Sequence, residues 1–521
     1  SSPTIVSTFS LLANKQSPAI MKVITVALLF LAATDTNAVA IRGTGGALNS
    51  NVGPPKPVSS ATPEDAVALK AAVGNSGTTE FEKEGHTKRL CADLQRSLEG
   101  EVHCNVTNYD FDLHNPDCAG LVPDVVVRPA SSSDVSKAIL TAKKFGVPLS
   151  VRSGGHSYTC NAFKDSGIHL DLRSIKGRRI FQKDGEWFAQ FETGNTFADL
   201  FKTMDTRRFT FLHGECWSVG VGGFFLHGGA HVTSIQEMYA SWANETITSM
   251  EVVTADGQIR TLSDDSDDQL LWKAMRQAGS SFGVATSLTI RMWEVPEPTR
   301  WEITTPLNMT TSDILRWMEV APSLKLSFYP LSHEIWAASK EGGLTMLDDL
   351  RQLVNASQAV SIRSGNEDSS YFGRYTSAST MVSRNLTAFI KVSLEASNQL
   401  DPTQCWQVIK PFRPDDHIIR PIDEFKMTYE TTCFSAERNL HFSKTLSDLE
   451  DAYDEIDAHR SKYYNVPSRN TSNTDNYWGG DADLLRSIKQ QYDADDLFHV
   501  YQGVRLLHNQ MPSILNVGLE H

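Results

Sequence analysis

The chain has 521 residues, of which 40% are hydrophobic and 21% charged; this is a globular composition, too long for one core, and it predicts two or three domains. The formal net charge of −14 argues against nucleic acid and anionic membranes as partners, because both select basic patches. After residue 40, no stretch reaches the roughly 18 apolar residues that span a bilayer, so we expect no membrane partner.

The N-terminal region has the pattern of a secretion signal. Lys22 follows the first methionine, and an apolar run over 23–33 precedes a small-residue cleavage site at 38–40. The next residues are rich in Gly, Pro, Ser and Thr, a composition typical of a linker. We therefore predict an upstream segment over 1–20, a signal peptide over 21–40, a flexible leader over 41–85 and regular structure from near residue 86.

Six N-x-S/T sequons support secretion. One such match is common by chance, but six behind a signal peptide predict a secreted, N-glycosylated protein. Their asparagines are Asn105, Asn244, Asn308, Asn355, Asn385 and Asn470.

Residues 122–172 have the pattern of an α/β unit. A short strand, "DVVVRP", ends at Pro129, and a Ser-capped helix follows over 131–146, with apolar residues at helical spacing and Gly146 as terminator. Two further strands are predicted in "VPLSVRSG" and "IHLDL".

Two glycine-rich loops then stand out, "RSGGHS" at 152–157 and "SVGVGGFFLHGGAH" at 218–231. Such loops expose backbone N–H groups that suit a phosphate, although neither is a dinucleotide or P-loop motif. Each loop alone could be a tight turn. Each also has a nucleophilic side chain beside its glycines, His156 within the first loop and Cys216 two residues before the second, which together favour a cofactor site.

The second half changes character. Residues 296–455 mix short alternating runs, such as "EITTPLNM" and "LTAFIKVSLEA", with acidic helices such as "SDLEDAYDEIDAH", and we predict a second α+β domain there. The tail over 479–504 is predicted as a helix followed by an extended end.

From about residue 120 to 505 the chain resembles the berberine-bridge-enzyme-like flavoproteins, which have a vanillyl-alcohol-oxidase type FAD domain. The matching motifs are "PDVVVRPASSSDVSKAI", "VPLSVRSGGHSY", "GECWSVGVGG", "ANETITSMEVVTADGQI", "LLWKAMRQAGSSFGVATSLTI", "YYN" and the tail from Tyr477. The resemblance implies an α+β fold: a two-part FAD-binding domain over 86–295, a substrate domain over 296–455, and a C-terminal segment over 456–521 that returns to complete the FAD domain.

The resemblance also implies roles for residues. His156 matches the histidine that bonds to the 8α-methyl group of the flavin, and Cys216 matches the cysteine that bonds to carbon 6 in bicovalent members. The other expected cofactor contacts are Arg152, Ser153, Gly154, Gly155, Ser157, Val219, Gly220, Val221, Gly222, Gly223, Gly228, Gly229, Val284 and Asn465.

The cysteine count is odd, which is unusual in a secreted chain. Three disulfides would use six of the seven cysteines and leave one, and Cys216 is the one with an assigned use. The alternative is a free or intermolecular thiol elsewhere. Pairing does not follow from the sequence, although Cys405 with Cys433 is plausible.

The chain departs from the family pattern in two places. Phe224, His227 and His231 replace a His and two Gly residues of the second loop, and we expect the two histidines to pack near the cofactor phosphates or pocket wall rather than bind metal. The family's C-terminal motif YxNY lacks its last tyrosine here, where the sequence is Tyr463-Tyr464-Asn465-Val466. Candidates for the catalytic base are Tyr463, Tyr464 and Glu437, each of which could instead be structural.

The expected function is a secreted, monomeric FAD oxidase that takes a hydride from an alcohol or hemiacetal carbon, plausibly of a sugar, and passes it to O₂. A small side chain at Val219, beside the flavin, would favour access of O₂ in this family, although valine is also a common strand residue. The alternatives are a dehydrogenase or oxidative cyclase on the same scaffold, and a non-catalytic flavin-binding glycoprotein.

Overall fold

The computed structural model describes most of the chain from Glu80 onward. The described residues are 80–204, 209–214, 216–229, 242–294, 300–304, 309–320, 325–332, 334–338, 360–363, 374–382, 384–411, 427–435, 439–458, 477–478, 481–500 and 503–506. Among the described residues, the first regular element is helix α4 (Glu80–Ser97), which begins six residues before the predicted start of regular structure.

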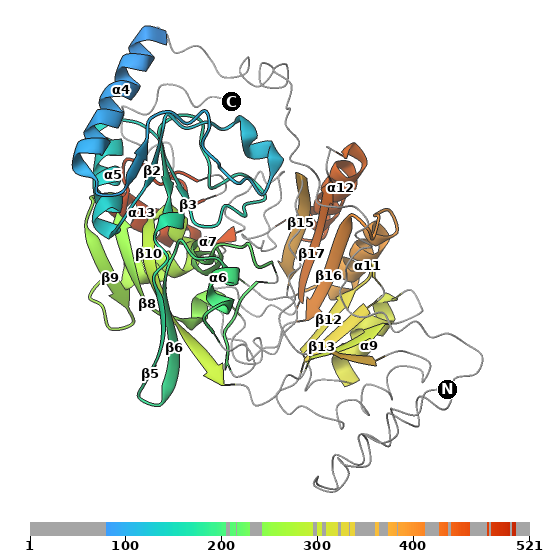
Figure 1. Ribbon diagram of the computed structural model, residues 1–521. Helices are drawn as coiled ribbons and strands as arrows, with labels where there is room; N and C mark the ends of the chain where they lie inside the picture. Colours follow the sequence, from blue (N-terminus) through green and yellow to red (C-terminus); the bar gives the residue numbers. More distant parts are fainter. Residues whose placement is uncertain are drawn as a thin grey trace, which may run out of the picture. The chain divides into compact units, whose positions relative to one another are not determined.

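A four-stranded sheet, the parallel sheet, has the strand order β1-β2-β4-β3. Figure 1 labels two of its strands, β2 and β3. Strand β4 pairs in parallel with both β2 and β3, while β1 runs antiparallel to β2 at one edge. Most of the valines and leucines of these strands pack with α4 and α5 in one hydrophobic cluster. The strands are β1 Glu101–His103, β2 Val125–Arg128, β3 Leu149–Arg152 and β4 Ile168–Asp171.

Helix α5 (Ser132–Phe145) lies between β2 and β3 in the chain, as its sequence pattern predicts. Its buried face contains Val135, Ala138, Ile139 and Ala142, which recur at helical spacing. Gly146 follows with φ 63°, a left-handed conformation that favours glycine and ends the helix. The predicted strand–helix–strand pattern is therefore confirmed.

The second sheet, the antiparallel sheet, has strands in the order β5-β6-β10-β8-β9, and β7 pairs with β10 outside this path. Its core contains residues of helices α6, α7, α8 and α13, so the predicted C-terminal helix packs against the middle of the chain. The strands are β5 Arg178–Lys183, β6 Glu186–Glu192, β7 Phe209–Thr210, β8 Ile247–Thr254, β9 Ile259–Ser263 and β10 Gly283–Glu294. The helices are α6 Phe197–Phe201, α7 Val221–Leu226, α8 Gln269–Ala278 and α13 Ala482–Tyr492.

A seven-stranded sheet follows, with the order β14-β11-β13-β12-β16-β17-β15 and its own hydrophobic core. The strands are β11 Arg300–Thr304, β12 Lys325–Tyr329, β13 Glu334–Ala338, β14 Val360–Arg363, β15 Arg374–Val382, β16 Cys405–Pro411 and β17 Met427–Ser435. The helices are α9 Thr311–Val320, α11 Leu386–Ser397 and α12 Leu440–Ile456.

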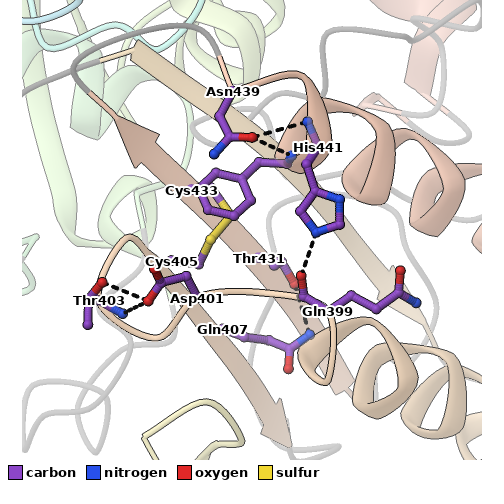
Figure 2. Close-up of a disulfide and its surroundings, with 10 residues drawn as sticks. Gln399, Asp401, Thr403, Cys405, Gln407, Thr431, Cys433, Asn439 and His441 are labelled. Carbon is purple, nitrogen blue, oxygen red and sulfur yellow. Dashed lines mark hydrogen bonds between the residues drawn. A yellow bond between two sulfur atoms is a disulfide. The ribbon is translucent and has the colours of Figure 1, made fainter.

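Figure 2 shows the disulfide that joins β16 to β17, where Cys405 and Cys433 face each other in the strand register. Beside it, the side chain of Asn439 accepts hydrogen bonds from the backbone N–H groups of His441 and Phe442 and so starts helix α12. The plausible Cys405–Cys433 pair is therefore confirmed.

The alternating run at 386–396 forms helix α11, so its interpretation as an extended run is wrong. The buried residues of the helix are Phe389, Ile390, Ser393 and Ala396, which follow a spacing of three to four residues. Apolar and polar residues also alternate over part of this stretch, but the helical spacing decides which residues face the core.

Short 3₁₀ helices complete the described regular structure. They are η1 Pro116–Gly120, η2 Leu172–Ser174, η4 Ala243–Thr246 and η5 Gly279–Ser281. Within the described ranges, no helix combines the length and the apolar character needed to cross a membrane.

Candidate cofactor site

The first glycine loop begins where β3 ends, and the buried side chain of Arg152 holds it in place by hydrogen bonds to backbone carbonyl oxygens. The guanidinium of Arg152 donates to the carbonyl oxygens of Phe111, Asp112 (3.1 Å) and Gly154 (3.0 Å). Gly155 has φ 80°, and a Cβ there would lie 2.7 Å from Nε of Arg152. Glycine is thus required twice over, by the backbone conformation and by the close guanidinium.

Arg152 therefore serves the loop itself, and its contacts here are to protein oxygens rather than toward open space. Its exposed fraction is 0%, and the ring of Phe163 lies 5.7 Å from its guanidinium carbon. In this structure Arg152 shapes the glycine turn. Its direct contact with the cofactor stays a prediction.

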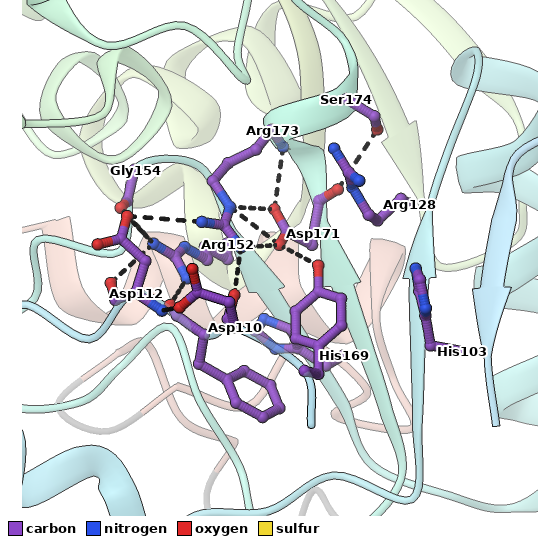
Figure 3. A network of polar contacts seen from close by, with 12 residues as sticks. His103, Asp110, Asp112, Arg128, Arg152, Gly154, His169, Asp171, Arg173 and Ser174 are labelled. Carbon is purple, nitrogen blue, oxygen red and sulfur yellow. Dashed lines mark hydrogen bonds and ion pairs between the residues drawn. The ribbon is translucent and has the colours of Figure 1, made fainter. Parts of the chain in front are cut away.

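A second set of charges extends this support across the ends of β3 and β4 (Figure 3). Arg173 donates to both carboxylate oxygens of buried Asp171, with a shortest distance of 2.6 Å, and the Tyr109 hydroxyl donates to the same carboxylate at 2.6 Å. Burial alone would raise the pKa of Asp171, but these hydrogen bonds lower it to about 2. Burial, together with the same carboxylate, raises the pKa of Tyr109 to about 12.

The two glycine loops lie in direct contact. A Cβ on Gly154 would overlap the backbone of Gly220, and one on Gly220 would overlap the backbone of Gly154. Ser153 joins the loops as well, since its hydroxyl donates to the carbonyl of Thr193 at 2.5 Å and accepts from the backbone N–H of Gly222 at 3.1 Å. The glycines thus allow an approach that side chains would block.

The second loop is held from its other side by residues 195–198. The backbone of Phe197 donates to Val219, that of Ala198 donates to Trp217, and Val221 donates to Asn195. Helix α7 begins directly after Gly220, and Gly223 lies exposed on it, where a Cβ would meet nothing within 4 Å. The stretch from Cys216 to α7 is therefore a well-supported turn with a surface free of side chains at Gly223.

His156 and Cys216 are both half-buried in these neighbouring loops. All seven cysteines lie in the described residues, and six of them form disulfides, namely Cys91–Cys104, Cys118–Cys160 and Cys405–Cys433. Cys216 is the one outside these pairs. The count of three disulfides with Cys216 left over is therefore confirmed.

Residues 114–118 also belong to this site, although sequence reasoning missed them. The ring of His114 stacks on that of His156 with centroids 3.4 Å apart. The side-chain amide of Asn115 donates to the carbonyl of Tyr158 at 2.8 Å, and Cys118 is bonded to Cys160. Burial, with His156 nearby, lowers the pKa of His114 to about 2. The only signal in the sequence was the Asn-Pro turn followed by a cysteine.

Two of the substituted positions of the second loop, Phe224 and His227, pack inside the protein. His227 is 8% exposed, and its ring is hydrogen-bonded to the carbonyl oxygen of Gly223 at 2.9 Å and to the hydroxyl of Ser280 at 2.6 Å. Phe224 packs edge-on against Phe197, with ring centroids 5.0 Å apart, and its ring leaves no space for a Cβ on Gly229.

The other predicted site residues fall into three groups. Val284 lies in β10 with its side chain in the hydrophobic cluster of the parallel sheet. Ser157 accepts from the backbone N–H of Asn161 at 3.0 Å, and Gly228 has φ 87°. The predictions that lie outside the described residues are His231, Glu437, Tyr463, Tyr464 and Asn465. Within the described residues, no group of three or more His, Cys, Asp or Glu could hold a metal ion.

The side chains and the empty surface of these loops fit the FAD that the sequence resemblance implies. An imidazole and a thiol are groups that can bond covalently to a carbon atom. Gly154 and Gly220 let the two loops that carry these groups approach each other closely, and Gly223 leaves open space near the start of α7.

Comparison with known protein families gives two matches, at both ends of this arrangement. The FAD binding domain family matches residues 123–263, and the berberine and berberine-like family matches residues 462–505. The first match contains both glycine loops, and the second contains α13.

Individual relatives are similar over part of their length. A xylooligosaccharide oxidase of Thermothelomyces thermophilus is 29% identical over 238 residues, which are 44% of this chain and 47% of the relative. The matched region thus spans about half the length of that relative.

Solved structures are similar over most of the chain. The berberine-bridge-enzyme-like protein 1 of Physcomitrella patens has a TM-score of 0.67 at 18% identity, covering 81% of this chain and 99% of that one. A glucooligosaccharide oxidase of Acremonium strictum, whose cofactor is a 6-S-cysteinyl, 8α-N1-histidyl FAD, has a TM-score of 0.67 at 17% identity over 80% and 99%. With the match to the FAD binding domain family, these likenesses confirm the predicted α+β fold of the vanillyl-alcohol-oxidase type.

Proposed function

The chain is related to the berberine-bridge-enzyme-like FAD-linked oxidoreductases through both its FAD-binding domain and its C-terminal segment, and on that premise we propose that it is a carbohydrate oxidase. It would take a hydride from an alcohol or hemiacetal carbon of a sugar and reduce O₂ to H₂O₂. Sugar oxidases among its relatives and structural neighbours support this substrate class.

The observation that carries the proposal is the contact between the two glycine loops, each with a nucleophilic side chain. In this reading, His156 and Cys216 hold FAD covalently, and the cofactor supplies the hydride acceptor. The His/Cys-linked FAD of the Acremonium strictum enzyme supports the same arrangement. Ser153, Gly154 and Gly220 maintain the spacing between the loops.

The protein must also remove the proton of the substrate hydroxyl as the hydride leaves. Tyr463, Tyr464 and Glu437 remain our candidates for this base, with Asn465 as a cofactor contact. Each is tested by a single substitution, Tyr463→Phe, Tyr464→Phe or Glu437→Gln. The variant that removes the base should have a lower kcat and should keep its flavin attached.

The test of the cofactor proposal is chemical. Purified protein is denatured and precipitated with acid, and its peptides are analysed by mass spectrometry. We expect a yellow precipitate and a flavin adduct on the peptides that contain His156 and Cys216. In Cys216→Ala, flavin should stay attached through His156. A colourless precipitate with all FAD in the supernatant would contradict covalent attachment.

Activity is tested by peroxide release on a panel of mono- and oligosaccharides and simple alcohols. Flavin bleaching by a sugar, with one H₂O₂ per turnover, is the expected result. Bleaching with slow reoxidation in air, but fast turnover with a quinone, would support the dehydrogenase alternative. If no compound in a broad panel bleached the flavin, the protein would be the non-catalytic flavoprotein.

Val219 allows a sharper test of the oxidase reading. Its side chain is partly buried against the core of the antiparallel sheet, three residues after Cys216. We expect Val219→Ile to slow reoxidation of substrate-reduced flavin, since one added methylene narrows the space for O₂. Reoxidation as fast as in the unmodified protein would show that the side chain at position 219 does not control access of O₂.

A further inference from the structure

Residues 114–118, which we call the clamp segment, contact every second residue from 156 to 160. We call residues 152–160, which contain the first glycine loop and His156, the flavin-attachment loop. His114 stacks on His156 with ring planes 26° apart, Asn115 donates to the carbonyl of Tyr158, and Cys118 is bonded to Cys160. A stacking contact, a hydrogen bond and a covalent bond thus hold three residues of the loop just after its glycines.

The clamp segment is itself well fixed. Asn115 is 1% exposed, and its side-chain oxygen accepts from the backbone N–H of Asp117 at 3.0 Å as the N-cap of η1. A few residues earlier, the carbonyls of Phe111 and Asp112 accept from Arg152. The same chain segment therefore supports the loop both before and after its glycines.

His114 is the member of the clamp that touches the reacting ring. It is 6% exposed, so its ring has little freedom to move. A half-buried histidine normally rotates about two side-chain bonds. A flat, fixed neighbour at 3.4 Å removes much of that freedom, and fixed geometry is what makes a bond-forming step fast.

We propose that His114 is a positioning residue for the covalent attachment of FAD to His156. This inference rests on the covalent flavin of the proposed function. In the attachment step, a ring nitrogen of His156 bonds to the 8α carbon of the flavin, and that nitrogen and that carbon each lose one hydrogen. The released electron pair reduces the flavin and is then taken, with two protons, by O₂, which leaves as H₂O₂.

In this role His114 stacks an uncharged ring on the imidazole of His156. An imidazole must be uncharged at the attacking nitrogen to act as a nucleophile. A second imidazolium stacked on it would add positive charge beside the forming bond. Burial keeps the pKa of His114 low, so its ring stays neutral over the pH range in which the protein would attach FAD.

The test compares two apolar substitutions of His114. His114→Phe keeps a flat ring, whereas His114→Leu does not. Both are made in Cys216→Ala, so that attached flavin reports on His156 alone. Flavin-free protein is mixed with FAD in air, and the flavin that survives acid precipitation is followed with time. His103→Leu, at a half-buried histidine that contacts Tyr109 edge-on, serves as the control.

We expect His114→Leu to slow attachment about tenfold or more, and His114→Phe and His103→Leu to stay within about twofold of the parent. Non-covalent FAD affinity, melting temperature and the Cys118–Cys160 disulfide are measured in parallel and should change little. A structural defect alone would alter those properties together with the rate.

Two results would overturn the inference alone: attachment at the parent rate in His114→Leu, or equal slowing in His114→Phe and His114→Leu. A parent protein with no attached flavin would instead overturn the proposed function on which the inference rests.

Discussion

Gly154 and Gly220 show at the scale of single atoms why the two loops contain glycine. Neither position has space for even one added carbon, because each would overlap the backbone of the other loop. The loops can meet only if both positions lack a side chain.

We therefore expect Gly154→Ala to push the loops apart and to lower FAD retention at least tenfold. Gly120→Ala is the matched control, because a Cβ at Gly120 would meet nothing within 4 Å. Flavin absorbance per protein after gel filtration is the measurement. Equal flavin content in the two variants would show that the contact does not matter for cofactor binding.

Asn244 is the one described sequon that is buried. It is 2% exposed, and its side-chain amide donates to the carbonyl of Arg276 at 2.7 Å, whereas Asn105 and Asn385 are exposed. The sequence predicts secretion, and on that prediction we expect glycan on Asn105 and Asn385 and none on Asn244. Glycopeptide mass spectrometry decides this, and occupied Asn244 in folded protein would contradict the packing described here.

At the scale of elements, the pair Asp171–Arg173 connects the end of β4 to the segment that contains Tyr109 and Asp112. Asp171 is fully buried, and its carboxylate accepts from Arg173, Tyr109 and the Arg173 backbone. A buried carboxylate with this many donors stabilises the fold only while it is charged.

Because the folded pKa of Asp171 is about 2, below its ordinary value of 3.8, its contribution is full above about pH 4 and is lost as the pH falls toward 2. Asp171→Asn should lower the free energy of unfolding at pH 7 by roughly 3 kcal/mol. The difference from the unmodified protein should shrink between pH 4 and pH 2. Denaturant unfolding at several pH values measures this, with exposed Asp184→Asn as the control.

Helix α13 is held by a buried cation. The ammonium of Lys489, 0% exposed, donates to the carbonyl of Ser281 at 2.9 Å and to Asp493 at 2.8 Å, and it pairs with Asp496 at 2.8 Å. Lys489→Met leaves two carboxylates without this cation and should cost roughly 3–5 kcal/mol of stability. Lys444→Met, in an exposed pair with Asp448, should change the melting temperature little. Similar melting temperatures for both variants would contradict this account.

Local patterns predicted the elements that depend on near neighbours. Helix α5 and strands β2, β3 and β4 follow from caps, breakers and apolar spacing, and the glycine loops follow from composition. Helix α11 was misread because two periodicities overlap in one short run. The clamp segment and the support by Asn195 were missed because their contacts join residues distant in the chain, and single-residue patterns do not encode such contacts.

At the scale of the whole molecule, the core of the antiparallel sheet combines residues from two distant stretches. Tyr477, Trp478 and Leu485 are buried in the same cluster as Phe191 and Leu288. Contacts between α8 and the C-terminal segment include the side chains of Gln277 and Asp481, 2.9 Å apart.

We therefore expect a chain that stops before residue 477 to lose FAD binding and the cooperative unfolding of this core. Cys405 and Cys433, in the seven-stranded sheet, should still form their disulfide in the shortened chain. Non-reducing peptide mapping and flavin absorbance measure the two outcomes. A shortened chain that bound FAD as tightly as the full one would show that the C-terminal segment is dispensable.

The late position of these core residues also determines when the protein can finish folding during synthesis. A ribosome adds about 5–20 residues per second, so residues 477–506 emerge some tens of seconds after the first glycine loop. From the moment each strand emerges until then, the apolar side chains of β6 and β10 lack their last partners and are open to aggregation. The seven-stranded sheet, whose residues are made in between, can close before the domain that began earlier.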